Sequence, residues 1–294
     1  MTRRTRKRAW MALVAAAVAG RGVADDVFRD DFERGDLARW SSAVGFVPPT
    51  VARYSDLDLR DPHLFVAPLP FTCVDVTDSS LIPGVPAFNP SLATAITTDG
   101  DADGLLDLSS LLLFRPLATT GTGLRVDLAS GSCTAPIETT SCAADLASSP
   151  TVTTYDDAAS GTCLAPGAGT TSGYSPAIVA PAGPCFATAE STIALDLQGT
   201  PVTLAHARLA ARFAGAAPLA LADGLLAGFL SEADADAILL PADFPLVGGQ
   251  PLSILLPGGT GNCSSHDDRD TVDGVSGWWF YFAFTAGEVP YTSP

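Results

Sequence analysis

The sequence has little positive charge. Its 294 residues contain 16 Lys and Arg against 32 Asp and Glu, and the sole lysine is Lys7. Six of the basic residues lie within positions 1–24, so the rest of the chain has 10 basic and 32 acidic residues and a formal charge of −22. Such a surface repels phosphate backbones and anionic lipid. We therefore expect no nucleic-acid partner, and metal cations are the natural counterpart.

Long hydrophobic runs of the kind that span membranes are also missing. The apolar stretch from Ala9 to Gly20 has 12 residues, whereas a transmembrane helix needs about 20. It follows the basic run Thr2 to Arg8 and precedes the small residues Gly22, Val23 and Ala24, which is the layout of a cleaved secretory signal peptide. We predict that residues 1–24 are a signal peptide, that the protein is secreted (extracellular or periplasmic) and that no membrane span remains.

The spacing Cys-x-x-Cys is absent, which argues against a zinc ribbon and against a thioredoxin-type redox site. The six cysteines all follow the signal peptide, and an even number in an oxidising compartment predicts three disulfides. Six cysteines allow 15 pairings. Pairing near neighbours first gives Cys133 with Cys142 and Cys163 with Cys185, and leaves Cys73 with Cys263.

Recognisable catalytic motifs are few, and no catalytic residue is assigned. The chain has three histidines, and the sequence around Ser276 lacks the fifth-position glycine of the G-x-S-x-G nucleophile elbow. The acidic cluster from Ser265 to Gly274 contains His266 and four Asp. It is either a second cation site or a polar loop neutralised by Arg269, and His266 could serve as a general base. A secreted hydrolase of esterase or glycosidase type, using His266 or acidic residues, is therefore the alternative function.

Long helical patterns are scarce, because 27 Gly and 23 Pro divide the chain into short apolar runs. This arrangement is typical of β-rich secreted domains. We predict that residues 25–294 form a single mainly β domain, an antiparallel β-sandwich-like fold with one or two short helices, cross-linked by disulfides. The segment 119–172 is rich in Thr, Ser, Ala and Gly, and we expect it to be a disulfide-pinned loop region.

Three segments carry clearer patterns. Residues 193–197 and 202–213 predict a β-hairpin. In its second strand, one face is expected to point toward the core: Thr203, Ala205, Ala207, Leu209, Ala211 and Phe213. The other face is expected to point toward solvent: Val202, Leu204, His206, Arg208 and Arg212. The aromatic run 278–284 predicts a buried central strand. Residues 221–240 predict a helix that ends before a proline, with a capping-box-like Ser231.

The segment Asp99 to Asp107 has the clearest chemical signal. It places the carboxylates of Asp99, Asp101, Asp103 and Asp107 at positions 1, 3, 5 and 9 of a loop, with glycine at position 6. Calcium takes six to eight oxygen ligands, and a glycine permits the sharp turn that aims alternate side chains at one ion. The carbonyl of Leu105, at position 7, would add a further ligand. The sequence thus predicts a Ca²⁺ site formed by Asp99, Asp101, Asp103, Leu105 and Asp107.

This loop resembles the D-x-D-x-D-G-x-x-D loops of EF-hand-like repeats, dockerins, thrombospondin type 3 repeats and integrin-type propeller repeats. It departs from a true EF-hand, because position 12 is Ser110 rather than Glu and Pro116 follows soon after. The strand-flanked, propeller-type variant fits better, with residues 108–114 as the following strand. A single copy implies no propeller or dockerin function.

A second resemblance lies near the N-terminus. The residues from Asp30 to Trp40 resemble the D-x-F-E-x-G-D-L-x-x-W motif that begins many uncharacterised secreted bacterial proteins, which implies export and a bacterial origin but no activity. We therefore expect a secreted calcium-binding protein that acts as a binding or surface-associated module. Its ligand, a carbohydrate or a protein, is left open by the sequence.

Overall fold

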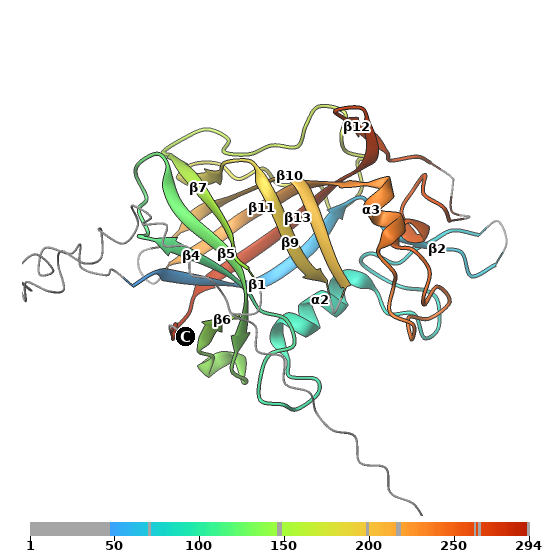
Figure 1. Cartoon of the computed structure of the whole chain (residues 1–294), viewed down its shortest axis with the longest axis horizontal. Coiled ribbons are helices and arrows are strands. Elements are labelled where there is room, and N and C mark those ends of the chain that lie inside the picture. Colours follow the sequence, from blue (N-terminus) through green and yellow to red (C-terminus); the bar gives the residue numbers. More distant parts are fainter. Residues whose placement is uncertain are drawn as a thin grey trace, which may run out of the picture. The chain divides into compact units, whose positions relative to one another are not determined.

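The computed structural model describes residues 48–69, 72–145, 149–197, 200–215, 219–261, 263 and 266–292 (Figure 1). These residues belong to one compact unit that begins at Val47. The predicted signal peptide and the motif from Asp30 to Trp40 lie outside the described residues. Both therefore stay predictions.

The described chain is mainly β, as its composition predicts. Two short α-helices, α2 (Phe88–Thr97) and α3 (Glu232–Ala237), and two 3-10 turns, η2 (Ile137–Thr139) and η3 (Leu252–Leu255), accompany the strands. The strands are β1 (Thr50–Asp61), β2 (Phe65–Val66), β3 (Val74–Asp75), β4 (Ser110–Arg115), β5 (Leu124–Cys133), β6 (Cys142–Ala144), β7 (Thr151–Ala158), β8 (Cys185–Thr188), β9 (Ser191–Leu197), β10 (Thr200–Ala214), β11 (Ala220–Ser231), β12 (Asp270–Val272) and β13 (Val275–Glu288).

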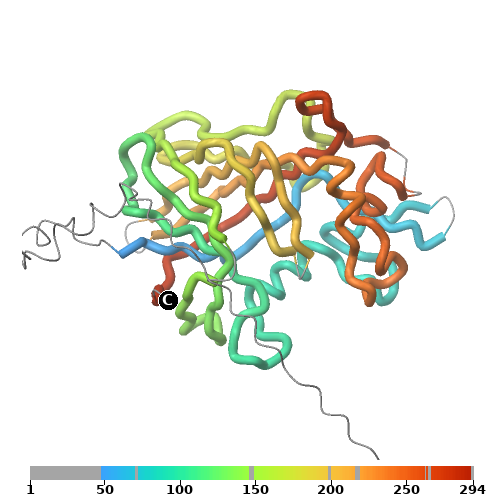
Figure 2. Tube along the Cα trace, in the orientation of Figure 1, coloured from blue at the N-terminus to red at the C-terminus, as the bar shows by residue number. Residues whose placement is uncertain are grey.

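The main sheet is antiparallel and closes on itself. Its order is β1-β4-β5-β7-β8-β10-β11-β13, and β13 pairs in turn with β1, for example Phe282 opposite Leu59. Figure 2 shows this closure, because β1 in blue and β13 in red run side by side. The two layers expected of a sandwich are therefore opposite walls of one continuous ring of eight strands. Three further strands pair with members of this ring: β6 with β5, β9 with β10 and β12 with β13.

The aromatic strand β13 is buried on both faces, which confirms the predicted central strand. Successive side chains of a strand point to opposite faces. Trp278, Phe280 and Phe282 accordingly join the main core inside the ring, whereas Trp279 and Tyr281 pack in a smaller cluster outside it. This two-sided burial explains why the run has no polar positions.

The predicted hairpin is present as β9 and β10, but the predicted faces are wrong for the first half of β10. There Val202 and Leu204 are buried, and in the second half Leu209 and Ala211 are buried instead. His206 lies between the halves with φ 50°, where the register with β11 shifts. A bulge adds one residue to the strand and so reverses which alternate set faces the core.

The predicted helix over residues 221–240 is wrong for most of its length. Residues up to Ser231 form β11, and only α3 is helical. The apolar run suits a strand that lies between β10 and β13. A Cβ atom on Gly224 would lie 2.6 Å from the carbonyl oxygen and ring of Phe284, so glycine permits this close pairing. The expected cap is present, because Asp234 N donates to Ser231 Oγ at 3.0 Å.

The segment 119–172 is not the loop region that its composition suggests, because it contains β5, β6 and β7. Two of the predicted disulfides are present, Cys133–Cys142 and Cys163–Cys185. The Cys263 side chain hydrogen-bonds with that of Cys73. These two side chains are neighbours, and the third disulfide, Cys73–Cys263, stays a prediction.

Candidate metal centre

The acidic loop from Asp99 to Asp107 joins α2 to β4, and a buried arginine holds both of its ends. Arg53 on β1 is 3 % exposed. Its guanidinium donates to the carbonyl of Ile96, in the last turn of α2, and to the carbonyl of Leu108 at 3.0 Å. Burial lowers the pKa of Arg53 to about 10, so the side chain stays charged at neutral pH. The loop is thereby anchored to the sheet at entry and exit.

The helix before the loop is tied to the same strand. Asn89 of α2 accepts a hydrogen bond from Leu59 N at 2.8 Å and donates one to Leu59 O at 3.0 Å. The loop thus follows a helix rather than the strand expected of the propeller-type variant, whereas β4 follows it as predicted. Both flanking elements are fixed to β1, so the loop starts and ends at defined points.

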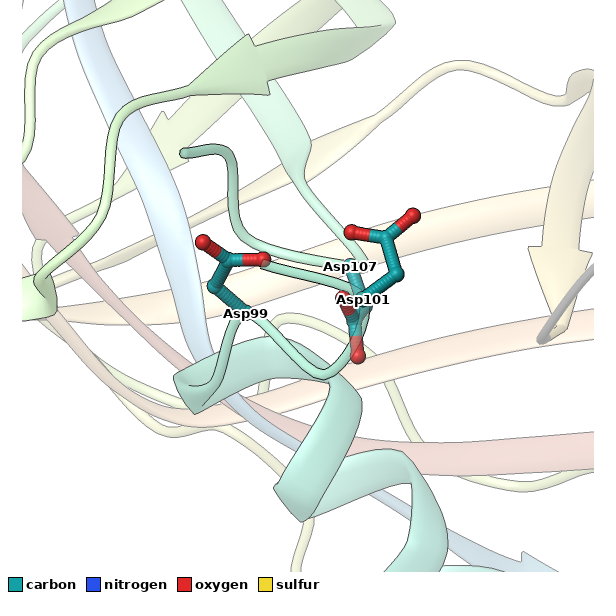
Figure 3. A group of neighbouring side chains, drawn as sticks. All are labelled: Asp99, Asp101 and Asp107. Carbon is teal, nitrogen blue, oxygen red and sulfur yellow. The ribbon is translucent and has the colours of Figure 1, made fainter. Parts of the chain in front are cut away.

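Three carboxylates gather within the loop. Asp99, Asp101 and Asp107 each offer an oxygen, and these oxygens all lie within 4.8 Å of one another. Figure 3 shows the three side chains grouped beyond the end of α2. Asp101 and Asp107 are exposed to solvent and Asp99 is half-buried. Such a group can coordinate a hard divalent cation, with water and carbonyl oxygens completing the shell.

Backbone amides hold these carboxylates in place. Asp99 accepts from Asp103 N at 3.1 Å and from Gly104 N at 2.9 Å, and Asp107 accepts from Gly100 N at 2.9 Å. Gly104 has φ 89°, a conformation that glycine adopts without a Cβ penalty. The turn predicted at position 6 of the loop is therefore the turn that folds the chain back on Asp99.

The other two predicted ligands lie in the loop but outside this group of three. The carboxylate of Asp103 accepts from Leu105 N at 2.8 Å. Leu105 forms an isolated antiparallel bridge with Thr134. The neighbouring residues make the bonds Leu106 N to Cys133 O at 2.8 Å and Ala135 N to Gly104 O at 2.9 Å. The disulfide-closed β5–β6 hairpin therefore supports one side of the loop.

Sequence reasoning missed both supports of the loop. Arg53 lies 46 positions before Asp99, in a strand with mixed polar and apolar residues, and nothing in its local sequence links it to the loop. The Cys133–Cys142 pairing was predictable from spacing, but its contact with the loop was not.

No protein-family model, curated protein or solved structure matches this chain. Within the described residues, no helix has the length and apolar character needed to cross a membrane.

A second polar cluster surrounds Tyr174. Its hydroxyl donates to Asp268 Oδ2 at 2.5 Å and lies 2.5 Å from Nε2 of His266. The Tyr174 ring stacks on His63, with ring centroids 4.0 Å apart, and His63 Nδ1 lies 2.6 Å from Asp75 Oδ2. Burial, followed by the bond to Asp268, raises the pKa of Tyr174. The cluster borders a hollow of ≈ 450 Å³ that residues 169–172, Tyr174 and residues 266–270 line.

Asp61 lies in the same region and is 3 % exposed. Burial raises the pKa of Asp61 to about 6, and the charge of Asp268 adds to this effect, although Ser172 N donates to Asp61 Oδ2 at 2.8 Å and opposes it. An unfolded aspartate has a pKa of about 3.9. Folding therefore favours the protonated form of Asp61 relative to the unfolded chain. The stability that this protonated carboxyl contributes is present below about pH 4 and is lost as the pH rises through about 6.

The substitution Asp61→Asn is expected to remove this pH dependence. Asparagine keeps the shape and an acceptor for Ser172 N but cannot ionise. Relative to the wild type, the variant should gain about 2 to 3 kcal/mol in free energy of unfolding between pH 4 and pH 7, since one pKa unit corresponds to about 1.4 kcal/mol. Urea unfolding at several pH values, in EDTA, measures this. The exposed Asp243→Asn is the control, and identical pH profiles for wild type and Asp61→Asn would contradict the assignment.

Proposed function

We propose that this chain is a secreted calcium-binding protein in which the loop from Asp99 to Asp107 holds one Ca²⁺ ion, and that it acts as a binding or surface-associated module. The observation that carries the proposal is the convergence of the Asp99, Asp101 and Asp107 oxygens to within 4.8 Å of one another. Two disulfides support an oxidising compartment, where such cross-links persist. Extracellular calcium is abundant enough for a partly exposed site of modest affinity.

The role we assign to the ion is structural. Three aspartates close together repel one another in the absence of a cation, and a divalent ion reverses the sign of that interaction. Arg53 and the β5–β6 hairpin already hold the ends of the loop, so little further ordering is required when the ion binds. Calcium would therefore stabilise the junction between α2 and β4 rather than take part in chemistry.

Calcium is expected to raise the melting temperature of the wild type. A ligand at one hundred times its dissociation constant adds about 2.7 kcal/mol, which corresponds to about 5 to 10 °C for a domain of this size. Asp101→Ala should abolish the increase, because it removes one of the three converging carboxylates. Differential scanning calorimetry in EDTA and then in excess CaCl₂ measures the shift.

The control for that experiment is Asp243→Ala, which removes one exposed carboxylate outside the loop and should keep the full shift. Magnesium is the second comparison, since it demands tighter octahedral geometry and dehydrates reluctantly. Equal calcium shifts in wild type and Asp101→Ala would overturn the proposed site. A magnesium shift as large as the calcium shift would overturn its assignment to calcium.

The alternative of a secreted hydrolase depends on His266. One observation favours it, because His266 lies at a hollow beside Asp268 and Tyr174. The Tyr174 hydroxyl, however, bonds both Nε2 of His266 and Oδ2 of Asp268. Tyr174 thus occupies Nε2, the nitrogen through which His266 would act beside Asp268, so we rank this function second.

A further inference from the structure

An apolar cavity of ≈ 80 Å³ lies at the end of the strand ring that α2 and η3 border. Its walls come from Leu59 of β1, Val202 of β10, Phe280 of β13, Phe88 of α2 and Leu255 of η3. Of its 15 lining residues, all in the described part of the chain, only Ser91 and Thr200 have polar side chains. The Ser91 hydroxyl donates to Ala87 O at 2.7 Å, so it does not require a ligand as its acceptor.

A ring of eight strands has an interior that is either just filled by side chains or able to hold one small ligand. Edge-to-face packing of Phe114, Tyr155 and Phe186, with centroids 5.4 Å apart, fills another part of this interior. The residual cavity is apolar, and apolar cavities stay dry because water finds no hydrogen-bond partners there. An apolar occupant would restore the dispersion contacts that the lining side chains lack.

A wider hollow shares two lining residues with the cavity. Pro86 and Ser91 line both the cavity and a hollow of ≈ 530 Å³ that follows α2 past Thr94 to Asp107. An α-helix rises ~1.5 Å per residue, so Ser91 and the helix end at Thr98 are about 10 Å apart. A ligand that reaches past Ser91 from the cavity to the hollow would meet an apolar inner end and a more polar outer end.

We propose that this site binds the aliphatic tail of an amphiphile with an uncharged head group, with the terminal carbons in the cavity and the head in the hollow along α2. The cavity has about half the volume of an engineered apolar cavity of ~150 Å³ that binds benzene, so it suits a few methylene groups better than a ring. Among the described residues that line either space, only Asp107 is charged. That carboxylate, in a chain of net charge −16, disfavours a carboxylate or phosphate head. Binding of the tail does not depend on the calcium site, and the head-group preference is that of the calcium-free chain, because Asp107 is also a proposed calcium ligand.

Isothermal titration calorimetry with 1-octanol and with octanoate, both in excess EDTA, tests this. The wild type should bind 1-octanol saturably with one site per chain, and octanoate at least tenfold more weakly. Ser91→Leu places a larger side chain at the junction of the two spaces and should weaken 1-octanol binding at least tenfold. Thr97→Leu adds the same side chain at an exposed position of α2 that lines neither space, and it should bind 1-octanol as the wild type does.

The variant Phe244→Ala gives a second, independent readout, because it enlarges the cavity. It should raise the affinity for cyclohexylmethanol relative to 1-octanol by about tenfold, and it decides the question if Ser91→Leu does not fold. The proposal is overturned if the wild type binds no 1-octanol saturably, if Ser91→Leu and Thr97→Leu bind alike, or if Phe244→Ala leaves the preference unchanged. Octanoate binding as tight as that of 1-octanol would overturn the uncharged head group. Since EDTA is present throughout, none of these results bears on the calcium proposal.

Discussion

Replacing Arg53 with leucine should lower the free energy of unfolding by about 3 to 5 kcal/mol, because the buried carbonyls of Ile96 and Leu108 lose their donor and each unpaired group costs about 1 to 3 kcal/mol. The Ser109 hydroxyl loses its bond to Arg53 Nε as well. Urea unfolding followed by circular dichroism measures the loss. Arg53→Lys should fall between wild type and Arg53→Leu, since an ammonium keeps the charge but not the planar fork of donors.

The same substitution should weaken calcium binding at the loop at least tenfold. Without Arg53, both ends of the loop gain conformational freedom that has to be lost again when three carboxylates gather on an ion. The matched control on the same strand is Arg60→Leu, whose half-buried guanidinium pairs with Asp58 at 2.7 Å; it should leave calcium binding unchanged and cost less stability than Arg53→Leu. Similar losses of stability for Arg53→Leu and Arg60→Leu would refute the anchoring role.

Removing the indole of Trp278 is the second change with a large expected effect. The side chain is 0 % exposed inside the ring, and its Nε1 donates to Pro257 O at 2.8 Å. Trp278→Ala should lower the free energy of unfolding by about 3 to 5 kcal/mol, since it leaves a large cavity in the core. The segment that carries Pro257 would also lose its link to β13.

The variant Trp278→Phe separates these two contributions. It keeps most of the apolar volume but removes the indole donor, so Pro257 O keeps only the longer bond from Asp268 N at 3.4 Å. The lost bond and the smaller ring should together cost about 1 to 3 kcal/mol. Val275→Ala on the same strand, where the side chain is 48 % exposed, should stay within about 0.5 kcal/mol of the wild type. Circular dichroism during urea unfolding measures all three variants, and a loss for Trp278→Ala no greater than that for Val275→Ala would disprove the assigned role.

The acidic loop shows how a local pattern can place side chains without tertiary information. Asp99, Asp101 and Asp107 lie within nine positions, and the glycine at position 6 turns the chain through φ 89°. Short side chains on so tight a turn have few directions available, so the spacing alone predicted their convergence. Asp103 does not join them, because its carboxylate bonds to the amide of Leu105 two residues later, a local alternative that Asp often adopts.

What the sequence determined by itself is therefore local: the mainly β composition, the aromatic strand β13, the two near-neighbour disulfides, the cap at Ser231 and the acidic turn. Each depends on residues close together in the chain, whose preferences tertiary packing did not override. The tertiary structure alone decided the closure of the sheet, where Leu59 meets Phe282, and the bulge at His206 that exchanged the faces of β10. It also decided that residues 220–231 form a strand. Their apolar pattern does not distinguish a strand from a buried helix, and the strand forms because β10 and β13 pair with its two edges. Arg53 belongs to the same class, since only the folded sheet brings its guanidinium to the two ends of the loop.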